Sequence, residues 1–308
     1  MPARSFVAVN GAWAGLGNRI RFTLSARAIA EVEGREFAYV WPTRPGLFEP
    51  SLTDLWAYDA ARLPWGSVVP TMTEHRARLS RRHLLTEVRR ARDWAVLGSS
   101  VLHLDGREAS WESRLPGLTP VPEISDRVGA LRATLPERYV GVQVRAATTS
   151  HPSTAKASPV TWFVHRMQEQ LSQDPHVHFF LSCDEPGTER AIMDAIPNVT
   201  TIGDKGAYNS VDGLRAAVAD LYLLASSAHI LGPYLSSFVE LAWLLGGKAQ
   251  VLENSVHRFE PGSRIHRHMP VADSFRPPPS EVFVRNALMV AYDRVRTGAH
   301  SPMHRVQE

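Results

Sequence analysis

Residues 211–247 constrain the fold more than any other part of the chain. Residues 214–225 carry apolar side chains at helical spacing, and 228–231 then form a short apolar run that a Gly-Pro pair ends. A second apolar helix is expected to start at Ser236 and to end at a pair of glycines. This succession of helix, buried strand and helix predicts one unit of an α/β sheet.

The start of this second helix has the features of an anion site. Ser236 and Ser237 stand where the helix is expected to begin. Free backbone N–H groups, two hydroxyls and the positive end of the helix dipole would then point to one place. A simple N-cap explains Ser236 equally well, so the spacing alone leaves both interpretations open.

The rest of the second half alternates short strands with helices of ordinary length. The expected strands are 138–145, 177–182, 199–202 and 249–252, and the expected helices are 159–171 and 186–195. Such alternation predicts a mainly parallel sheet that is covered by helices on both faces.

The first half opens with a unit of the same kind. A strand at 5–9 leads into a glycine-rich stretch with Gly15 and Gly17, and a helix is expected at 20–34. This arrangement can bring backbone N–H groups close to a bound phosphate or sugar. The spacing GxxxGxG differs from the dinucleotide-binding GxGxxG, and a plain turn explains these glycines equally well.

The remainder of the first half is less regular. Strands are expected at 37–41 and 100–104, and helices at 73–97 and 124–135. Residues 43–72 are rich in proline and tryptophan and lack periodicity, so we expect a long surface excursion there. The helix at 73–97 is strongly basic, but no aromatic interleaving or recognition motif accompanies its arginines. We therefore expect a solvated helix face and no nucleic-acid partner.

The length of 308 residues suits two domains. We place an acceptor-side domain at 1–136 and a nucleotide-binding domain at 137–279. A C-terminal helix and tail follow at 280–308.

Composition excludes several classes of protein. The net charge of +3 is too small to indicate polyanion binding, and Cys183 is the only cysteine, which rules out an internal disulfide. The chain does not open on a basic region followed by a long apolar run, and it contains no run of about 18 apolar residues. We therefore expect neither a signal peptide nor a membrane span, and a cytoplasmic location. Histidines 257, 266 and 268 match no metal-ligand spacing, so we expect no metal.

Polar residues follow three of the expected parallel strands. Gln143 and Arg145 end one strand, Asp184 follows the next, and Ser236 follows a third. Because ligands bind outside the carboxyl ends of such strands, these residues are candidates for one site. Arg145 could hold two phosphate oxygens in a bidentate fork, although an arginine in this position is more often the partner of a carboxylate.

Asp220 lies on a helix that is otherwise apolar around it. A buried carboxylate is costly unless it has a hydrogen-bond donor. The edge of a guanine base would offer two adjacent N–H groups. The simpler expectation is a salt bridge to one of the many arginines.

Four stretches taken together resemble the fucosyltransferase superfamily of GT-B glycosyltransferases, which includes bacterial alpha-1,6-fucosyltransferases and protein O-fucosyltransferase-like enzymes. They are GLGNR at 15–19, the strand 139–145, FFLSCD at 179–184, and DLYLLA at 220–225 with SSF at 236–238. The similarity extends over 8–247 in the right order.

The resemblance implies two Rossmann-like domains facing across a cleft. The first would bind the acceptor and the second a nucleotide sugar, typically GDP-fucose, without a metal. Arg145 would hold the β-phosphate in place of a divalent cation, and Ser236, Ser237 and Phe238 would bind the phosphates at their helix start.

The resemblance also gives roles to the remaining candidates. Asp220 would read the base. Asn18 and Arg19, in the loop with Gly15 and Gly17, would approach the pyrophosphate or the acceptor. Gln143 and Asp184 would belong to the donor site.

Two departures from the family pattern affect these expectations. Gln143 stands where the family usually has histidine, and residues 146–149 replace the charged residues that often follow the arginine. The second departure removes an obvious catalytic carboxylate, so the sequence does not name a base.

The preferred hypothesis is an inverting, metal-independent glycosyltransferase of bacterial biosynthesis, using a GDP-linked sugar on a small-molecule or glycan acceptor. One alternative is an NAD(P)-dependent oxidoreductase, against which the missing GxGxxG argues. The other is a non-catalytic relative that keeps the nucleotide site. The acceptor and the oligomeric state are left open.

Overall fold

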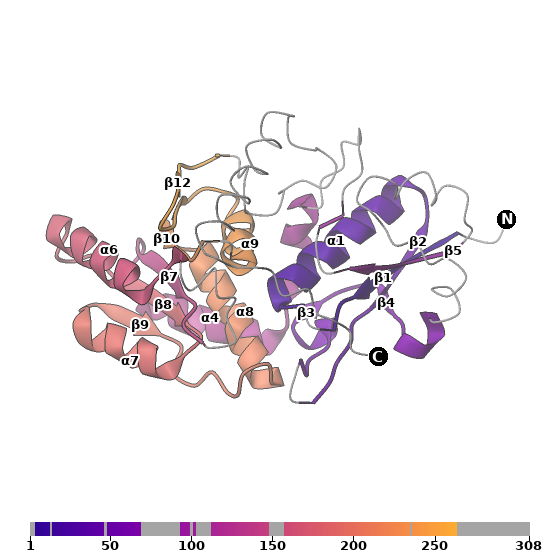
Figure 1. The fold of residues 1–308 in the computed structure, drawn as a ribbon, viewed down its shortest axis with the longest axis horizontal. Coiled ribbons are helices and arrows are strands. Elements are labelled where there is room, and N and C mark those ends of the chain that lie inside the picture. Colours follow the sequence, from indigo (N-terminus) through magenta and orange to yellow (C-terminus); the bar gives the residue numbers. More distant parts are fainter. Residues whose placement is uncertain are drawn as a thin grey trace.

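The computed structural model describes residues 4–12, 14–45, 48–68, 93–98, 101–102, 112–147, 157–234 and 236–263. These form two α/β halves that lie side by side, each built on its own sheet (Figure 1).

The first sheet is wholly parallel and has the order β4-β2-β1-β5. Its strands are β1 (Ser5–Asn10), β2 (Glu36–Val40), β4 (Ala61–Arg62) and β5 (Asp93–Gly98). Helix α1 (Leu16–Val32) joins β1 to β2. The chain then returns to the other side of β1, so the order reverses beside the carboxyl end of β1. Such a reversal is where open α/β sheets bind ligands.

The second sheet has the order β12-β11-β10-β7-β8-β9. Its strands are β7 (Val140–Val144), β8 (Phe179–Cys183), β9 (Val199–Thr201), β10 (His229–Leu231), β11 (Val251–Glu253) and β12 (Arg258–Phe259). All the pairings are parallel except that of β11 with β12. Here the order reverses between β7 and β10, which places a second ligand-binding position between these two strands.

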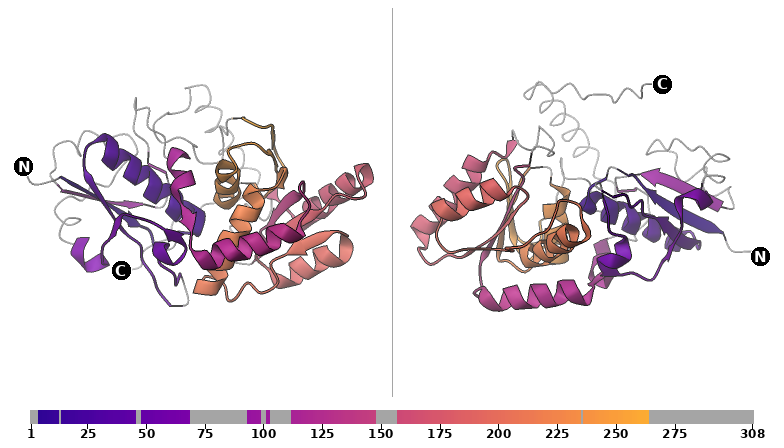
Figure 2. Two further views of the ribbon diagram at one scale, coloured as in Figure 1. Left: turned by 180° about the vertical axis from the view of Figure 1, so that it is seen from behind. Right: turned by 90° about the horizontal axis from the view of Figure 1, so that it is seen from below.

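Four helices connect the strands of the second sheet. They are α6 (Val160–Gln173), α7 (Pro186–Ala195), α8 (Val211–Ala225) and α9 (Ser237–Leu245). A further helix, α4 (Pro122–Thr134), leads from the first half to the second and packs on α8 (Figure 2). Helices α6 and α7 cover one face of the second sheet over a separate apolar cluster.

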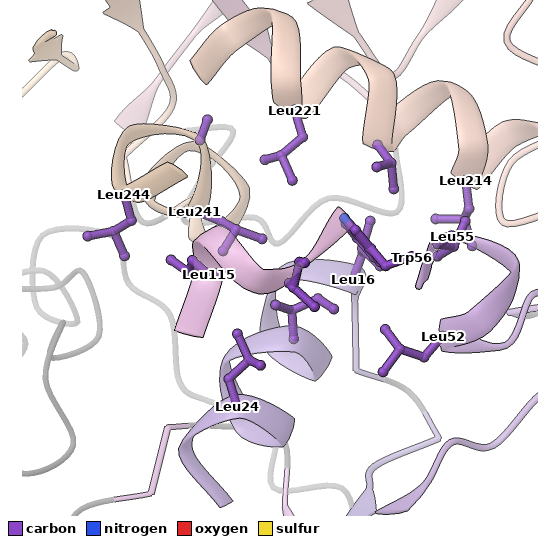
Figure 3. Close-up of a cluster of buried hydrophobic side chains, with 14 of the residues drawn as sticks. Leu16, Leu24, Leu52, Leu55, Trp56, Leu115, Leu214, Leu221, Leu241 and Leu244 are labelled. Carbon is purple, nitrogen blue, oxygen red and sulfur yellow. The ribbon is translucent and has the colours of Figure 1, made fainter. Parts of the chain in front are cut away.

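One hydrophobic core is shared by the two halves. It joins side chains of α1 in the first half to side chains of α8 and α9 in the second (Figure 3). Two short 3₁₀ helices, η1 (Leu52–Asp54) and η2 (Glu112–Gly117), and the antiparallel pair β3 (Trp56–Ala57) and β6 (Thr119–Pro120), complete this core. The indole of Trp56 donates to the Tyr222 hydroxyl at 3.1 Å, which adds a polar contact across the same boundary.

The structure confirms the predicted α/β class with two Rossmann-like sheets, and most elements of the second half start and end within two residues of their predicted bounds. Three expectations for the first half were wrong. Helix α1 begins at Leu16, so Gly17 lies in its first turn. Residues 101–102, inside the strand expected at 100–104, are not in a strand. Strand β5 lies earlier, at Asp93–Gly98, where the helix expected at 73–97 was to end. The segment after β2 is a surface excursion only in part, because Leu52, Leu55 and Trp56 are buried whereas residues 64–67 are exposed.

Some predictions are not tested by this structure. The basic stretch 73–92 and the C-terminal helix expected within 280–308 lie outside the described residues. The bounds chosen for the two domains also stay predictions.

The first turns of α1 and α9 are in close contact. A Cβ atom added to Gly17 would lie 2.9 Å from Ser237 Oγ and 3.0 Å from the Ser237 carbonyl oxygen. Only a residue without a side chain fits this approach of one backbone to another. The two helix starts therefore meet, and their partial positive charges lie near each other.

We predict opposite effects for alanine at two helical glycines. Gly17→Ala should lower the free energy of unfolding by about 1–3 kcal/mol, because the added methyl group overpacks the contact with Ser237. Gly129→Ala, in the open interior of α4 with no atom within 4 Å, should raise it by about 1 kcal/mol through helix propensity. Urea denaturation measures both, and stabilisation by Gly17→Ala would contradict the close packing.

Candidate functional site

The candidate residues of the second half lie at one edge of its sheet. Arg145 follows β7, and Ser236 follows β10, which pairs with β7 in parallel. Both residues are therefore at carboxyl ends of neighbouring strands, at the position where the strand order reverses.

Ser236 joins the start of α9 to strand β7. Its Oγ accepts from the backbone N–H of Val239 at 3.4 Å, so the serine is the N-cap of α9. The same hydroxyl donates to Gln143 Oε1 at 3.3 Å. Ser236 and Gln143 are 2% and 5% exposed. Ser237 and Phe238, the first two residues of the helix, are half-buried.

Arg145 and Asp184 form an ion pair at the carboxyl ends of β7 and β8. Arg145 Nε lies 3.7 Å from Asp184 Oδ2, and the arginine side chain is 33% exposed. Asp184 Oδ1 also accepts from the backbone N–H groups of Ala146 and Ala147, at 2.7 and 2.9 Å. The carboxylate thus holds the loop after β7 and keeps Arg145 beside it.

Asp220 is buried against the same end of the sheet. Its Oδ2 accepts from the Ser182 hydroxyl at 2.7 Å and lies 3.9 Å from Lys205 Nζ. The partners of Asp220 are therefore Ser182 and Lys205, and the expected salt bridge to an arginine was wrong. Asp220 Oδ1 has no hydrogen-bond partner within the described part of the chain. Burial raises the pKa of this carboxyl to about 6, although Lys205 and Ser182 act in the opposite direction.

The polar residues of the second half form one continuous row. Gln143 of β7 and Ser182 of β8 are paired in register, so they lie on the same face of the sheet. Gln143 contacts Ser236 of α9, and Ser182 contacts Asp220 of α8. The fold thus brings the candidates on two strands and two helices to one edge.

The glycine-rich stretch contributes a helix start and a buried arginine. Arg19 is fully buried, and its guanidinium donates to the carbonyl oxygens of Ala12, Ala14 and Pro42 at 2.8–2.9 Å. The same group lies 3.9 Å from the centre of the Phe48 ring. Burial lowers the pKa of Arg19 to about 10. Arg19 therefore stabilises the loop from the protein interior. This position differs from the expectation that Arg19 reaches a bound ligand.

Gly15 and Asn18 lie on the accessible side of this stretch. Gly15 is exposed and serves as the N-cap of α1. Asn18 is half-buried, and its Oδ1 accepts from Arg21. Arg21 in turn pairs with Glu240 of α9, where both side chains are buried.

Sequence reasoning missed four residues of this region. They are Arg21, Ser182, Lys205 and Glu240. Glu240 could have been found by the signal that pointed to Asp220, since it is an acidic residue on an otherwise apolar helix. The others gain their significance from contacts between distant segments, which spacing along the chain does not show.

Two surface hollows lie away from the row of polar residues. One of about 350 Å³ is bordered by α4, residues 204–206 and the start of α8, and one of about 390 Å³ follows strands β2 and β4. Neither Arg145 nor Ser236 is among the described residues that line them.

The described residues contain neither a cluster of metal ligands nor a membrane-spanning helix. Among the described residues, no three His, Cys, Asp or Glu side chains come together as metal ligands. Within the same residues, every helix is too short or too polar to cross a bilayer.

The chain is similar to known proteins in its structure. No protein-family model and no curated protein sequence matches the chain. Fucosyltransferase NodZ from Bradyrhizobium superposes with a TM-score of 0.59 at 17% identity, covering 83% of this chain and 98% of that one. NodZ alpha-1,6-fucosyltransferase soaked with GDP-fucose gives 0.55 at 19% identity, covering 79% and 93%. POFUT1 in complex with GDP gives 0.51 at 9% identity, covering 83% and 100%.

These likenesses establish the class of fold. The two sheets have the GT-B-like arrangement of two Rossmann-like units, as the sequence predicted. More particularly, the fold is that of the fucosyltransferases NodZ and POFUT1, which confirms the predicted resemblance at the level of structure.

We predict that Asp220→Asn stabilises the protein more at neutral than at acid pH. The folded-state pKa of about 6 lies above the ordinary 3.8, so the folded protein binds this proton more tightly than the unfolded chain does. The stabilisation that comes from protonating Asp220 in the folded protein is therefore lost as the pH rises from 3.8 to about 6.

Urea denaturation of both proteins at pH 4 and pH 7 measures the effect. The stability of Asp220→Asn relative to the unmodified chain should increase by about 2 kcal/mol between these pH values. A difference that does not change with pH would contradict a buried carboxyl with a raised pKa.

Proposed function

We propose that this protein is an inverting, metal-independent glycosyltransferase that uses a nucleotide-diphosphate sugar, with GDP as the nucleotide. The observation that carries the proposal is the position of Arg145 and the Ser236–Ser237 helix start at the carboxyl ends of the paired strands β7 and β10. A guanidinium and a helix N-terminus on neighbouring strands are suited to bind one diphosphate.

The chemistry follows from the charges at this edge. When the bond from the sugar to the diphosphate breaks, negative charge grows on the leaving group. Arg145 and the N–H groups at the start of α9 are fixed positive groups that would stabilise this charge. Arg145 would thereby take the place of a divalent cation.

Asp184 is better suited to a supporting role than to that of a catalytic base. Its two oxygens contact the loop after β7 and Arg145. An acceptor hydroxyl of a small molecule or glycan would attack the sugar from the side opposite the diphosphate.

Asp220 would recognise the base. Its Oδ1 lacks a partner among the described residues, so the carboxylate can accept an N–H group from guanine. The known structures support this choice of nucleotide, because NodZ was co-crystallised with GDP and soaked with GDP-fucose, and POFUT1 was solved in complex with GDP.

Calorimetric titration with GDP, ADP, UDP and NAD tests the proposal. GDP should bind most tightly, and Arg145→Ala should weaken its binding at least about 100-fold, because a charge-assisted contact to phosphate is lost. Arg138→Ala is the matched control. Arg138 is exposed and precedes the same strand at its opposite end, so this variant should bind GDP as the unmodified protein does.

Two results would contradict the proposal. Binding of none of the three nucleoside diphosphates would end it, and tight binding of NAD without GDP would favour the oxidoreductase alternative. Hydrolysis of GDP-fucose that requires Arg145 would argue against a non-catalytic relative.

Inosine diphosphate tests the role of Asp220, because it lacks only the 2-amino group of GDP. The unmodified protein should prefer GDP by about 10-fold or more, the value of one hydrogen bond to a carboxylate. Asp220→Asn should reduce this preference, whereas Asp212→Asn, at an exposed position of the same helix, should leave it unchanged. An unaltered preference in Asp220→Asn would show that another residue reads the base.

A further inference from the structure

A buried ion pair links the two halves of the protein next to the proposed diphosphate site. Arg21 of α1 pairs with Glu240 of α9, and the two side chains are 2% and 0% exposed. The backbone N–H of Glu240 donates to the Ser236 carbonyl oxygen at 3.1 Å, so the glutamate lies one turn into the helix that starts at the site.

Stability alone does not explain this pair. Arg21 Nε and Glu240 Oε1 are buried without a hydrogen-bond partner among the described residues. Replacing such a pair by apolar side chains of similar volume often leaves a protein equally stable or more stable. The third contact of the group suggests a different role, since Arg21 also donates to Asn18 Oδ1.

The contact with Arg21 fixes which way the Asn18 amide faces. A guanidinium has only donors, so it can hold the oxygen of an amide and not the nitrogen. With Oδ1 turned to Arg21, the Nδ2 group of Asn18 is directed away from it. Asn18 lies in the first turn of α1, next to Gly17, whose backbone packs on Ser237.

We propose that Glu240 and Arg21 are positioning residues that lock Asn18 with its N–H donors toward the diphosphate of a bound nucleoside diphosphate. The first half then supplies one donor to a site that is otherwise built by the second half. This inference rests on the proposed function, and it adds that a buried ion pair between the two halves sets the orientation of Asn18.

A set of three variants tests whether the ion pair acts through Asn18. The GDP dissociation constant is measured by calorimetry for Asn18→Ala, for the double variant Arg21→Met with Glu240→Leu, and for the triple variant. Asn18→Ala should weaken binding about 10-fold, the value of a hydrogen bond to a charged group. The double variant should weaken it by a similar factor, and the triple variant no more than Asn18→Ala does.

A triple variant in which the two losses multiply, to about 100-fold, would overturn the inference, because the pair would then act independently of Asn18. The free energy of unfolding of each variant is measured alongside. A double variant that binds GDP normally would also overturn the inference. Failure of the unmodified protein to bind GDP would instead contradict the proposed function.

Asn18→Asp provides a second test that does not disturb the ion pair. A carboxylate still accepts from Arg21, so the variant should keep its melting temperature. It would however present an acceptor in place of a donor to the phosphate, and GDP affinity should fall at least about 100-fold. Unchanged GDP affinity in a folded Asn18→Asp protein would show that this side chain does not face the diphosphate.

Discussion

The structure depends on the contact between two helices that begin against each other. Helix α1 starts at the carboxyl edge of the first sheet and α9 at that of the second, and Gly17 lets their backbones touch at Ser237. Around this contact the two halves share one hydrophobic core, and the buried pair of Arg21 and Glu240 crosses the same boundary. The positive ends of two helix dipoles are therefore held at one place, which favours a bound anion.

The second half could be predicted closely from the sequence because its strands and helices alternate and are separated by glycine and proline. The ends of parallel strands also identify the edge where a ligand binds, so Gln143, Arg145 and Ser236 were expected to lie near one another. The structure brings Gln143 and Ser236 into contact and places Arg145 after the paired strand. It also gives Arg145 a carboxylate partner, Asp184.

The first half was less predictable because tertiary packing decides the structure of its irregular parts. Trp56 lies in a segment without periodicity, yet it is fully buried because it packs between the halves and donates to Tyr222. Arg19 was expected at a ligand, but three carbonyl oxygens of the surrounding loops hold it in the interior. Such contacts join segments far apart in the chain, and no local pattern in the sequence encodes them.

A crystal structure of the protein with GDP would show which residues bind the diphosphate. We predict that the β-phosphate lies about 3 Å from the Arg145 guanidinium and from the N–H groups at the start of α9. We also predict that the guanine edge faces Asp220. A GDP molecule bound instead in the hollow beside α4, with its phosphates away from Arg145 and Ser236, would contradict the proposed diphosphate site.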